Sequence, residues 1–290
     1  MENLESRLKK FETELVNLKY NLSKILSIFD KDFNREIILT LLKERGLNNI
    51  STEKMKLVLP KNVEYINEYF ELLNSYYFRR IVSDIIKKKE FDEYFINKLK
   101  EKWGEKAVNK YLPYILKYEI ITIKNGGYIS NYYNIDNFGD TLEWYIVKIL
   151  QNEFSTPSIS NVKIKGLSIG GDFDIFFLLL GKISYLEIKS SPPNNISIEE
   201  IENFVKRVDK INPYVSILFI DTTLNIKRNI IDNIKFLLKR VGRDFSERAI
   251  RNGFYKVSKG IYVFNSKRSF KISFNYVLED LIKEEKYWKY

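Results

Sequence analysis

The sequence predicts an α/β protein whose C-terminal half is a mixed sheet flanked by helices, with a mainly α-helical region before it. Two observations predict this fold class. From residue 139 onward, the patterns follow in the order helix, three strands, helix, strand, helix. Between residues 33 and 120, apolar residues mostly recur at helical spacing. We expect three parts: an arm at 1–30, a helical region at 31–135 and an α/β domain at 136–290.

The arm carries apolar residues at alternating spacings of four and three over residues 4–29. This heptad pattern is typical of a coiled coil, and an isolated helix of that length needs a partner in water. We therefore expect a homodimer formed through residues 4–29. A helix packed against its own chain would give the same pattern.

Three helices are expected in the first part of the helical region. The first covers residues 35–46 and ends at Gly46, which suits a C-cap. The second covers 51–60, with Ser51 or Thr52 at its start and Pro60 as its stop. The third covers the aromatic-rich stretch 62–89, whose Tyr and Phe stripe is interpreted as core.

A helix at 90–104 and another at 105–120 follow, and Pro113 is expected to kink or break the second. Asn125-Gly126-Gly127 then lies between alternating residues, which is a strong hairpin signal. Two helices followed by a small hairpin resemble a winged-helix domain at about 90–130. The resemblance implies either nucleic-acid binding or protein docking.

A hairpin at residues 170–191 organises the C-terminal half. Two apolar strands flank Gly181-Lys182, where a type II′ turn would place Asp174 opposite Lys189. Side chains two residues apart share a face, so four charged residues are expected on one side: Asp172, Asp174, Glu187 and Lys189. Four apolar residues are expected on the other side: Phe173, Ile175, Leu186 and Ile188.

Charged side chains on an apolar hairpin need an explanation, because buried charge is unfavourable unless it is paired or metal-bound. One explanation is a structural ion pair between Asp174 and Lys189. The other is an oxygen-ligand site for Mg²⁺ or Mn²⁺ with a lysine beside it, which suits chemistry on phosphates. The chain has no His and no Cys, so the usual general base and zinc ligands are missing. Their absence favours the metal–carboxylate interpretation.

Asp174, the hairpin and Glu187-Ile188-Lys189 together resemble the motif of the PD-(D/E)xK nuclease superfamily, which includes restriction endonucleases and archaeal Holliday-junction resolvases. Phe173 stands where the motif name has Pro. The resemblance covers about residues 138–265 and implies a restriction-endonuclease-like fold. It also implies metal-dependent hydrolysis of DNA.

The resemblance assigns roles to individual residues. Asp174 and Glu187 would hold the metal together with the Ile188 carbonyl, and Lys189 would orient the water or stabilise the phosphate. Glu143, on the helix before the hairpin, matches a further acidic position of the family. An exposed helical glutamate is the other interpretation of Glu143.

The elements after the hairpin fit the same order. Ser197 begins a helix with Glu200 as its capping box. The apolar run 215–221 suits a central buried strand, reached by a right-handed crossover. Residues 241–260 are interpreted as a basic loop, followed by one or two strands and a closing helix at 273–290.

Positive charge is concentrated in the last third of the chain. The whole sequence carries +10, and residues 201–290 hold 19 Lys and Arg against 10 Asp and Glu, a balance of +9. Such a field suits a polyanion. The candidate phosphate-binding residues are Lys227, Arg228, Arg243, Arg248 and Arg251. A surface network with Asp244 and Glu247, or a solvated lysine-rich surface, would also explain them.

The expected function is that of a DNA endonuclease or exonuclease dependent on Mg²⁺ or Mn²⁺. The alternatives are a non-catalytic DNA-binding protein that uses the winged-helix-like region, and a structural adaptor assembled through the coiled coil. No apolar run reaches the length of a membrane span, and the N-terminus does not have the pattern of a signal peptide. A cytoplasmic protein without membrane contact is therefore expected.

Overall fold

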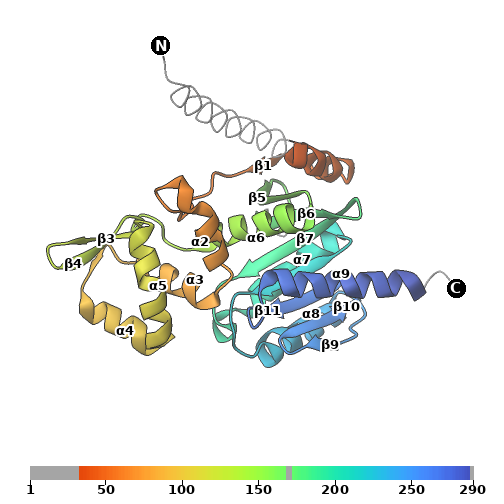
Figure 1. Ribbon diagram of the computed structural model, residues 1–290. Helices are drawn as coiled ribbons and strands as arrows, with labels where there is room; N and C mark the ends of the chain where they lie inside the picture. The colour runs from red at the N-terminus through yellow and green to blue at the C-terminus, as the bar shows by residue number, and fades with distance from the viewer. Residues whose placement is uncertain (1–32, 168–171, 288–290) are drawn as a thin grey trace, which may run out of the picture.

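A large mixed sheet lies at the centre of the computed structural model, which describes residues 33–167 and 172–287 (Figure 1). The predicted arm at 4–29 lies outside the described residues. The strand order is β1-β5-β6-β7-β8-β11-β10-β9. The strands are β1 (Ile50–Thr52), β5 (Ser158–Ile164), β6 (Asp172–Leu179), β7 (Lys182–Lys189), β8 (Ser216–Ile220), β9 (Arg248–Arg251), β10 (Phe254–Ser258) and β11 (Ile261–Asn265).

The pairing makes the sheet mixed. β7, β8 and β11 run parallel, whereas the other neighbours are antiparallel. β8 lies between two parallel strands and all five of its residues are buried, which confirms the central strand expected from the apolar run. The crossover from β7 to β8 passes through α7 (Ile198–Ile211), which begins with the predicted Ser197–Glu200 capping box.

Helices cover both faces of the sheet, so the α/β prediction is confirmed. α6 (Gly139–Phe154) and α9 (Phe270–Tyr287) lie on one face, with core residues such as Ile146 and Phe274 (Figure 1). On the other face lie α7, α8 (Asp232–Arg240) and a helix at 33–44, with core residues such as Phe204 and Ile234. In the described parts of the chain, no helix is long and apolar enough to cross a membrane.

The helical region packs as a smaller unit beside the sheet (Figure 1). A short sheet in the order β2-β4-β3 closes it, and α5 continues through Pro113 without a break. Its elements are a 3₁₀ turn (Val63–Tyr65), α2 (Ile66–Leu72), α3 (Tyr76–Ile86), β2 (Glu90–Phe91), α4 (Glu93–Trp103), α5 (Glu105–Lys117), β3 (Ile121–Lys124) and β4 (Gly127–Ser130).

Three expectations about local structure were wrong. The stretch 51–60 is not a helix, because Ile50–Thr52 pairs with β5 and the rest is irregular. The stretch 62–89 is interrupted, because Ser75 caps a new helix by accepting a hydrogen bond from the Phe78 N–H. The supposed loop at 241–260 contains β9 and β10, which extend the sheet. Tertiary pairing overrode the local pattern in the first and third cases.

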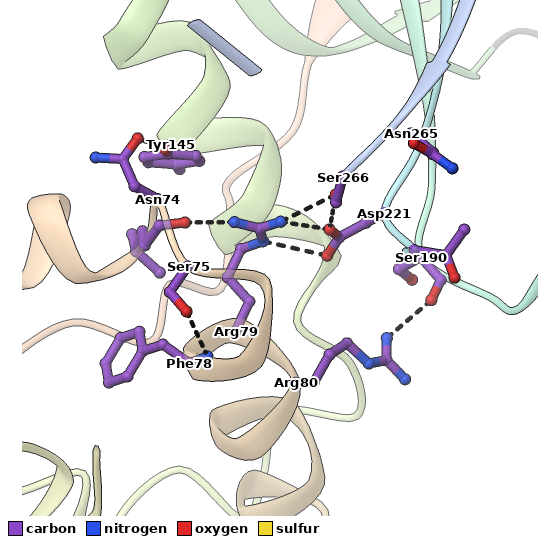
Figure 2. A network of polar contacts seen from close by, with 12 residues as sticks. Asn74, Ser75, Phe78, Arg79, Arg80, Tyr145, Ser190, Asp221, Asn265 and Ser266 are labelled. Carbon is purple, nitrogen blue, oxygen red and sulfur yellow. Dashed lines mark hydrogen bonds and ion pairs between the residues drawn. The ribbon is translucent and has the colours of Figure 1, made fainter. Parts of the chain in front are cut away.

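A buried polar network joins the helical region to the sheet (Figure 2). Arg79 on α3 forms an ion pair with Asp221, which follows β8, at 2.5 Å between Nη2 and Oδ1. Arg79 also donates to Ser266, which follows β11, and its neighbour Arg80 donates to the Ser190 carbonyl after β7. α3 therefore lies against the carboxyl ends of the three parallel strands.

Candidate active site

The β6–β7 hairpin brings Asp174, Glu187 and Lys189 together in a different register, whereas Asp172, the fourth predicted member, is exposed and pairs with Lys163. The turn is Leu180-Gly181, with φ of 52° and 71°, and Leu179 pairs with Lys182. Two residues of positive φ fit a type I′ turn rather than the expected type II′ turn. The register shifts by two residues, which leaves the faces of regularly alternating residues unchanged. Continuing the observed pairing of Ile175 with Leu186 places Asp174 beside Glu187 instead of Lys189.

Phe173 departs from the expected alternation. It contacts Phe176 and Tyr185, at 5.2 and 5.5 Å between ring centroids, on the α7 side of the sheet. The β5–β6 pairing is interrupted beside it, since no pairing joins Asn161 to Asp174, and Asn161 has a φ of 54°. Regular alternation is therefore lost at the residue that carries the acidic side chain.

Glu187 is the most enclosed acid of the site, with 2% of its side chain exposed. Lys189 lies 2.9 Å from its Oε1, and Arg207 of α7 lies 2.8 Å from its Oε2. The Tyr185 hydroxyl donates to the same Oε2. Both carboxylate oxygens of Glu187 are thus occupied by donors from this chain.

Asp174 faces the same cluster and accepts a hydrogen bond from the Ile188 N–H at 2.6 Å. Burial raises the pKa of Asp174 to about 7, and the charge of Glu187 adds to the rise. The Ile188 N–H, Lys189 and Arg207 oppose it. Ile188 thus meets the site through its N–H, whereas ligation through its carbonyl stays a prediction.

Glu143 reaches the site from α6. Burial, together with the charges of Asp174, Asp140 and Glu187, raises its pKa to about 9. Its Oε2 is buried and has no hydrogen-bond partner. An exposed helical glutamate would show neither property, so the structure favours the interpretation of Glu143 as part of the cluster.

Two cations, Lys189 and Arg207, lie among the acids, and Lys189 also lies 3.7 Å from Glu200. Burial lowers the pKa of Lys189, but Glu187 outweighs this effect and the net pKa is raised. The same competition raises the pKa of Arg207, through Tyr185 and Glu187. Both side chains therefore keep their positive charge. Asp172 is not part of this balance, because it is exposed and pairs with Lys163 at 3.3 Å.

The chemistry of these residues fits a hydrated divalent cation better than a protein-only metal cage. Among residues 33–167 and 172–287, no three acidic side chains converge as a ready metal cluster. Mg²⁺, however, keeps several waters and is usually held by one or two carboxylates together with substrate phosphates. The unpartnered oxygen of Glu143 and the neighbouring Asp174 meet that smaller requirement.

The predicted phosphate-binding residues lie away from this cluster and are mostly paired. Arg243 contacts Asp209 at 3.0 Å, Arg248 pairs with Asp280, and Lys227 pairs with Glu247. Arg251 lies over the Tyr276 ring at 5.4 Å. Arg228 is exposed and forms no ion pair with another described residue. Arg243, Arg248 and Lys227 are therefore paired with acids of the chain, as the alternative of a surface network expects. Glu247 was one of the expected acids, whereas Asp209 and Asp280 were not.

Sequence reasoning missed Arg207 and Tyr185. Tyr185 shares the face of Glu187 two residues along β7, so strand alternation alone indicated its position. Arg207 lies in the third turn of α7, and nothing in the local pattern distinguishes it from the other basic residues of that helix. Only the packing of α7 on β7 brings it to Glu187.

The sequence matches no protein-family profile and no curated protein. A solved structure with some similarity is that of protein VC1899 from Vibrio cholerae, at a TM-score of 0.42 and 10% sequence identity. The similarity covers 75% of this chain and 54% of that protein, so this chain spans about half of its length. Similarity at this level supports no conclusion about function.

Proposed function

We propose that this chain hydrolyses phosphodiester bonds in DNA, with Mg²⁺ or Mn²⁺ as its cofactor. The observation that supports the proposal is that Glu143 and Asp174 lie close enough to Glu187 for its charge to raise their pKa, while one Glu143 oxygen is buried without a partner. Acidic groups that repel one another in this way raise each other's pKa, and such sites are concentrated where proteins bind ions or perform catalysis.

Each residue has a role in this proposal. Glu143 and Asp174 offer oxygen atoms to the cation, and Glu187 holds the Lys189 ammonium at 2.9 Å. Lys189 stabilises the negative charge that grows on the phosphate as the bond breaks. When bound, the ion supplies an activated water and a clamp for the phosphate. Glu187 ligates the ion only if it gives up one of its present donors, Lys189, Arg207 or Tyr185.

A second candidate is a DNA-binding protein in which this fold is only a scaffold. The occupied carboxylate of Glu187 favours it, because a residue held by three donors is poorly prepared to bind a metal. The two candidates differ in one measurable property. Only the first predicts that a divalent cation binds at Asp174 and Glu143.

The test is single-turnover cleavage of duplex, single-stranded and branched DNA in Mg²⁺ or Mn²⁺, with cation affinity measured by calorimetry. We expect Asp174→Asn to lose both cleavage and cation binding, since it removes a ligand. Asp172→Asn is the matched control, because Asp172 lies on the same strand but pairs with Lys163 outside the cluster. Absence of both cleavage and cation binding in the wild type would leave the scaffold candidate.

Dimerisation through residues 4–29 is part of the proposal. Two copies would bring two sites to one duplex or junction, so that both strands are cut together. Light scattering on the full chain and on a variant lacking residues 1–29 tests it. A monomeric full chain, or a dimer that survives the truncation, would contradict this interface.

A further inference from the structure

The structure contains a hollow that the proposed catalytic residues do not use. It has a volume of about 780 Å³ and lies between the end of α3, the strand β2, the helix α4 and the β3–β4 hairpin. This end of the molecule projects away from the large sheet (Figure 1). α5, the helix that a winged-helix resemblance would present to DNA, contributes no lining residue.

Three lysines from three different elements line the hollow: Lys88, Lys98 and Lys124. None of them forms an ion pair with another described residue. Two further lysines, Lys87 and Lys89, flank Lys88 and are exposed. This arrangement differs from the C-terminal surface, where acids of the chain itself neutralise Arg243 and Arg248.

The hollow is lined by fewer acids than lysines, and one of these acids already accepts a hydrogen bond. Glu90 and Asp92 are the acidic residues of the lining. Asp92 caps α4 by accepting a hydrogen bond from the Phe95 N–H at 3.2 Å, where the helix dipole partly offsets its charge. The neighbouring Glu93 lies 3.6 Å from Lys100. The lining thus carries three lysines against two acids, and the Lys98 ammonium is hydrogen-bonded to Tyr94.

Aromatic rings lie between these lysines. Phe91 and Tyr128 stack at 5.3 Å with an angle of 15°, and Gly127 allows this approach, since a Cβ there would lie 3.1 Å from the Phe91 carbonyl. Tyr94 is 65% exposed, and the Lys98 ammonium lies 4.5 Å from its ring centroid. Tyr94 is thus an exposed ring beside a cation, which suits stacking with a flat group.

We propose that this hollow binds single-stranded nucleic acid, with a base stacked on Tyr94 and backbone phosphates on Lys88, Lys98 and Lys124. Rings that accept bases, combined with ammonium groups that follow the backbone, form the general chemistry of single-strand binding. A duplex satisfies only the lysines, because its bases are already stacked on one another. The proposal stands on the hollow alone and does not require that the chain cleave nucleic acid.

The experiment measures binding of the full chain to a fluorescent oligothymidylate of about 15 nucleotides, by anisotropy at several salt concentrations in EDTA. Replacing the three lysines with alanine is expected to reduce the slope of log affinity against log salt by about 2, at roughly 0.7 per phosphate contact on a single strand. Exposed lysines elsewhere provide the matched control: Lys43→Ala, Lys210→Ala and Lys239→Ala.

Tyr94→Ala is expected to weaken binding by about 5- to 100-fold without changing the salt slope, and Tyr94→Phe is expected to bind as the wild type does. Phe236→Ala, which removes a ring that is 55% exposed on α8, is the control. The proposal is overturned if the control lysines lower the slope equally, or if Tyr94→Ala has no effect. It is also overturned if duplex or polyglutamate competes as well as the single strand.

The experiment distinguishes failure of this proposal from failure of the proposed function. Cleavage is suppressed in EDTA, so binding is measured whether or not the chain is a nuclease. Lys182→Ala is expected to bind the oligonucleotide with wild-type affinity, because Lys182 belongs neither to the hollow nor to the carboxylate cluster. If the chain cleaves DNA but Tyr94→Ala binds the oligonucleotide as tightly as the wild type does, the proposed function is retained and binding in the hollow is rejected.

Discussion

Two buried charge clusters of this protein are built in opposite ways. Around Arg79, one guanidinium meets one carboxylate, Asp221, and the remaining polar atoms contact Ser266 and the Leu73 carbonyl (Figure 2). Around Lys189 and Arg207 lie Glu187, Asp174 and Glu200, and beside Asp174 one oxygen of Glu143 has no partner. The first cluster is balanced and joins two parts of the chain, whereas in the second the acids outnumber the cations.

Charge balance thus separates a structural cluster from a candidate functional one when both are buried. In a buried ion pair, the free energy lost by desolvating the two charges is about the free energy gained from their attraction. Removing one partner leaves the other charge buried and uncompensated, so the loss of stability shows how well the pair was matched. Uncompensated carboxylates instead destabilise the folded state at neutral pH, and a protein retains them when they serve another purpose. The predictions below test this distinction.

The largest effect on stability is expected at the balanced cluster. Arg79→Ala leaves Asp221 buried without its partner and should lower the free energy of unfolding by about 3–5 kcal/mol. Replacing both residues, as Arg79→Met with Asp221→Leu, should recover most of that loss. Urea denaturation measures both variants. A loss below about 1 kcal/mol for Arg79→Ala would show that water reaches the pair.

A comparable effect is expected on rate at the unbalanced cluster. Lys189→Ala should slow cleavage by about 100- to 1000-fold while cation affinity changes little, because its charge acts mainly on the transition state. Lys182→Ala at the other end of β7 is the control, since Lys182 lies over the Tyr214 ring and not near the carboxylates. Cleavage by Lys189→Ala at the wild-type rate would make Lys189 a purely structural partner of Glu187.

A smaller effect is expected in the pH dependence of stability. An acid whose pKa is higher in the folded chain holds its proton more tightly there, so stability is full below the unfolded pKa and falls as pH rises toward the folded value. For Asp174 and Glu143 the window runs from about pH 4 to about pH 9. Glu143→Gln should therefore exceed the wild type by roughly 1–3 kcal/mol at pH 9 and match it at pH 4.

The measurement is urea denaturation in EDTA across that pH range. Glu153→Gln on the same helix is the control, since Glu153 is exposed and pairs with Lys271. Added Mg²⁺ should restore the stability of the wild type at high pH but not change Glu143→Gln. If the free energies of unfolding of the wild type and of Glu143→Gln changed with pH in parallel, the neighbouring acids would not destabilise ionised Glu143.

The smallest effect is expected at an exposed pair. Arg243→Ala removes the contact with Asp209 and should change the free energy of unfolding by about 0.5 kcal/mol or less, because water and salt screen such pairs. The same variant tests whether Arg243 contacts phosphate. A reduction in the salt slope of duplex binding would restore the sequence-based prediction that this surface binds DNA.

Local patterns determined much of this protein. Alternation along β7 placed Tyr185, Glu187 and Lys189 on one face, and the capping box at Ser197 placed the start of α7. The apolar run of β8 identified the central strand. These features depend on side-chain periodicity and on contacts within a few residues, so a single sequence is enough to predict them.

Tertiary structure decided which groups meet. The turn at Leu180-Gly181 shifted the register by two residues and placed Asp174 beside Glu187, and the irregularity in β6 put Phe173 on the α7 side of the sheet. Packing of α7 and α6 brought Arg207 and Glu143 to the hairpin from positions 20 and 44 residues away from Glu187. Charge repulsion and pairing depend on distances in space, and periodicity along the chain does not encode them.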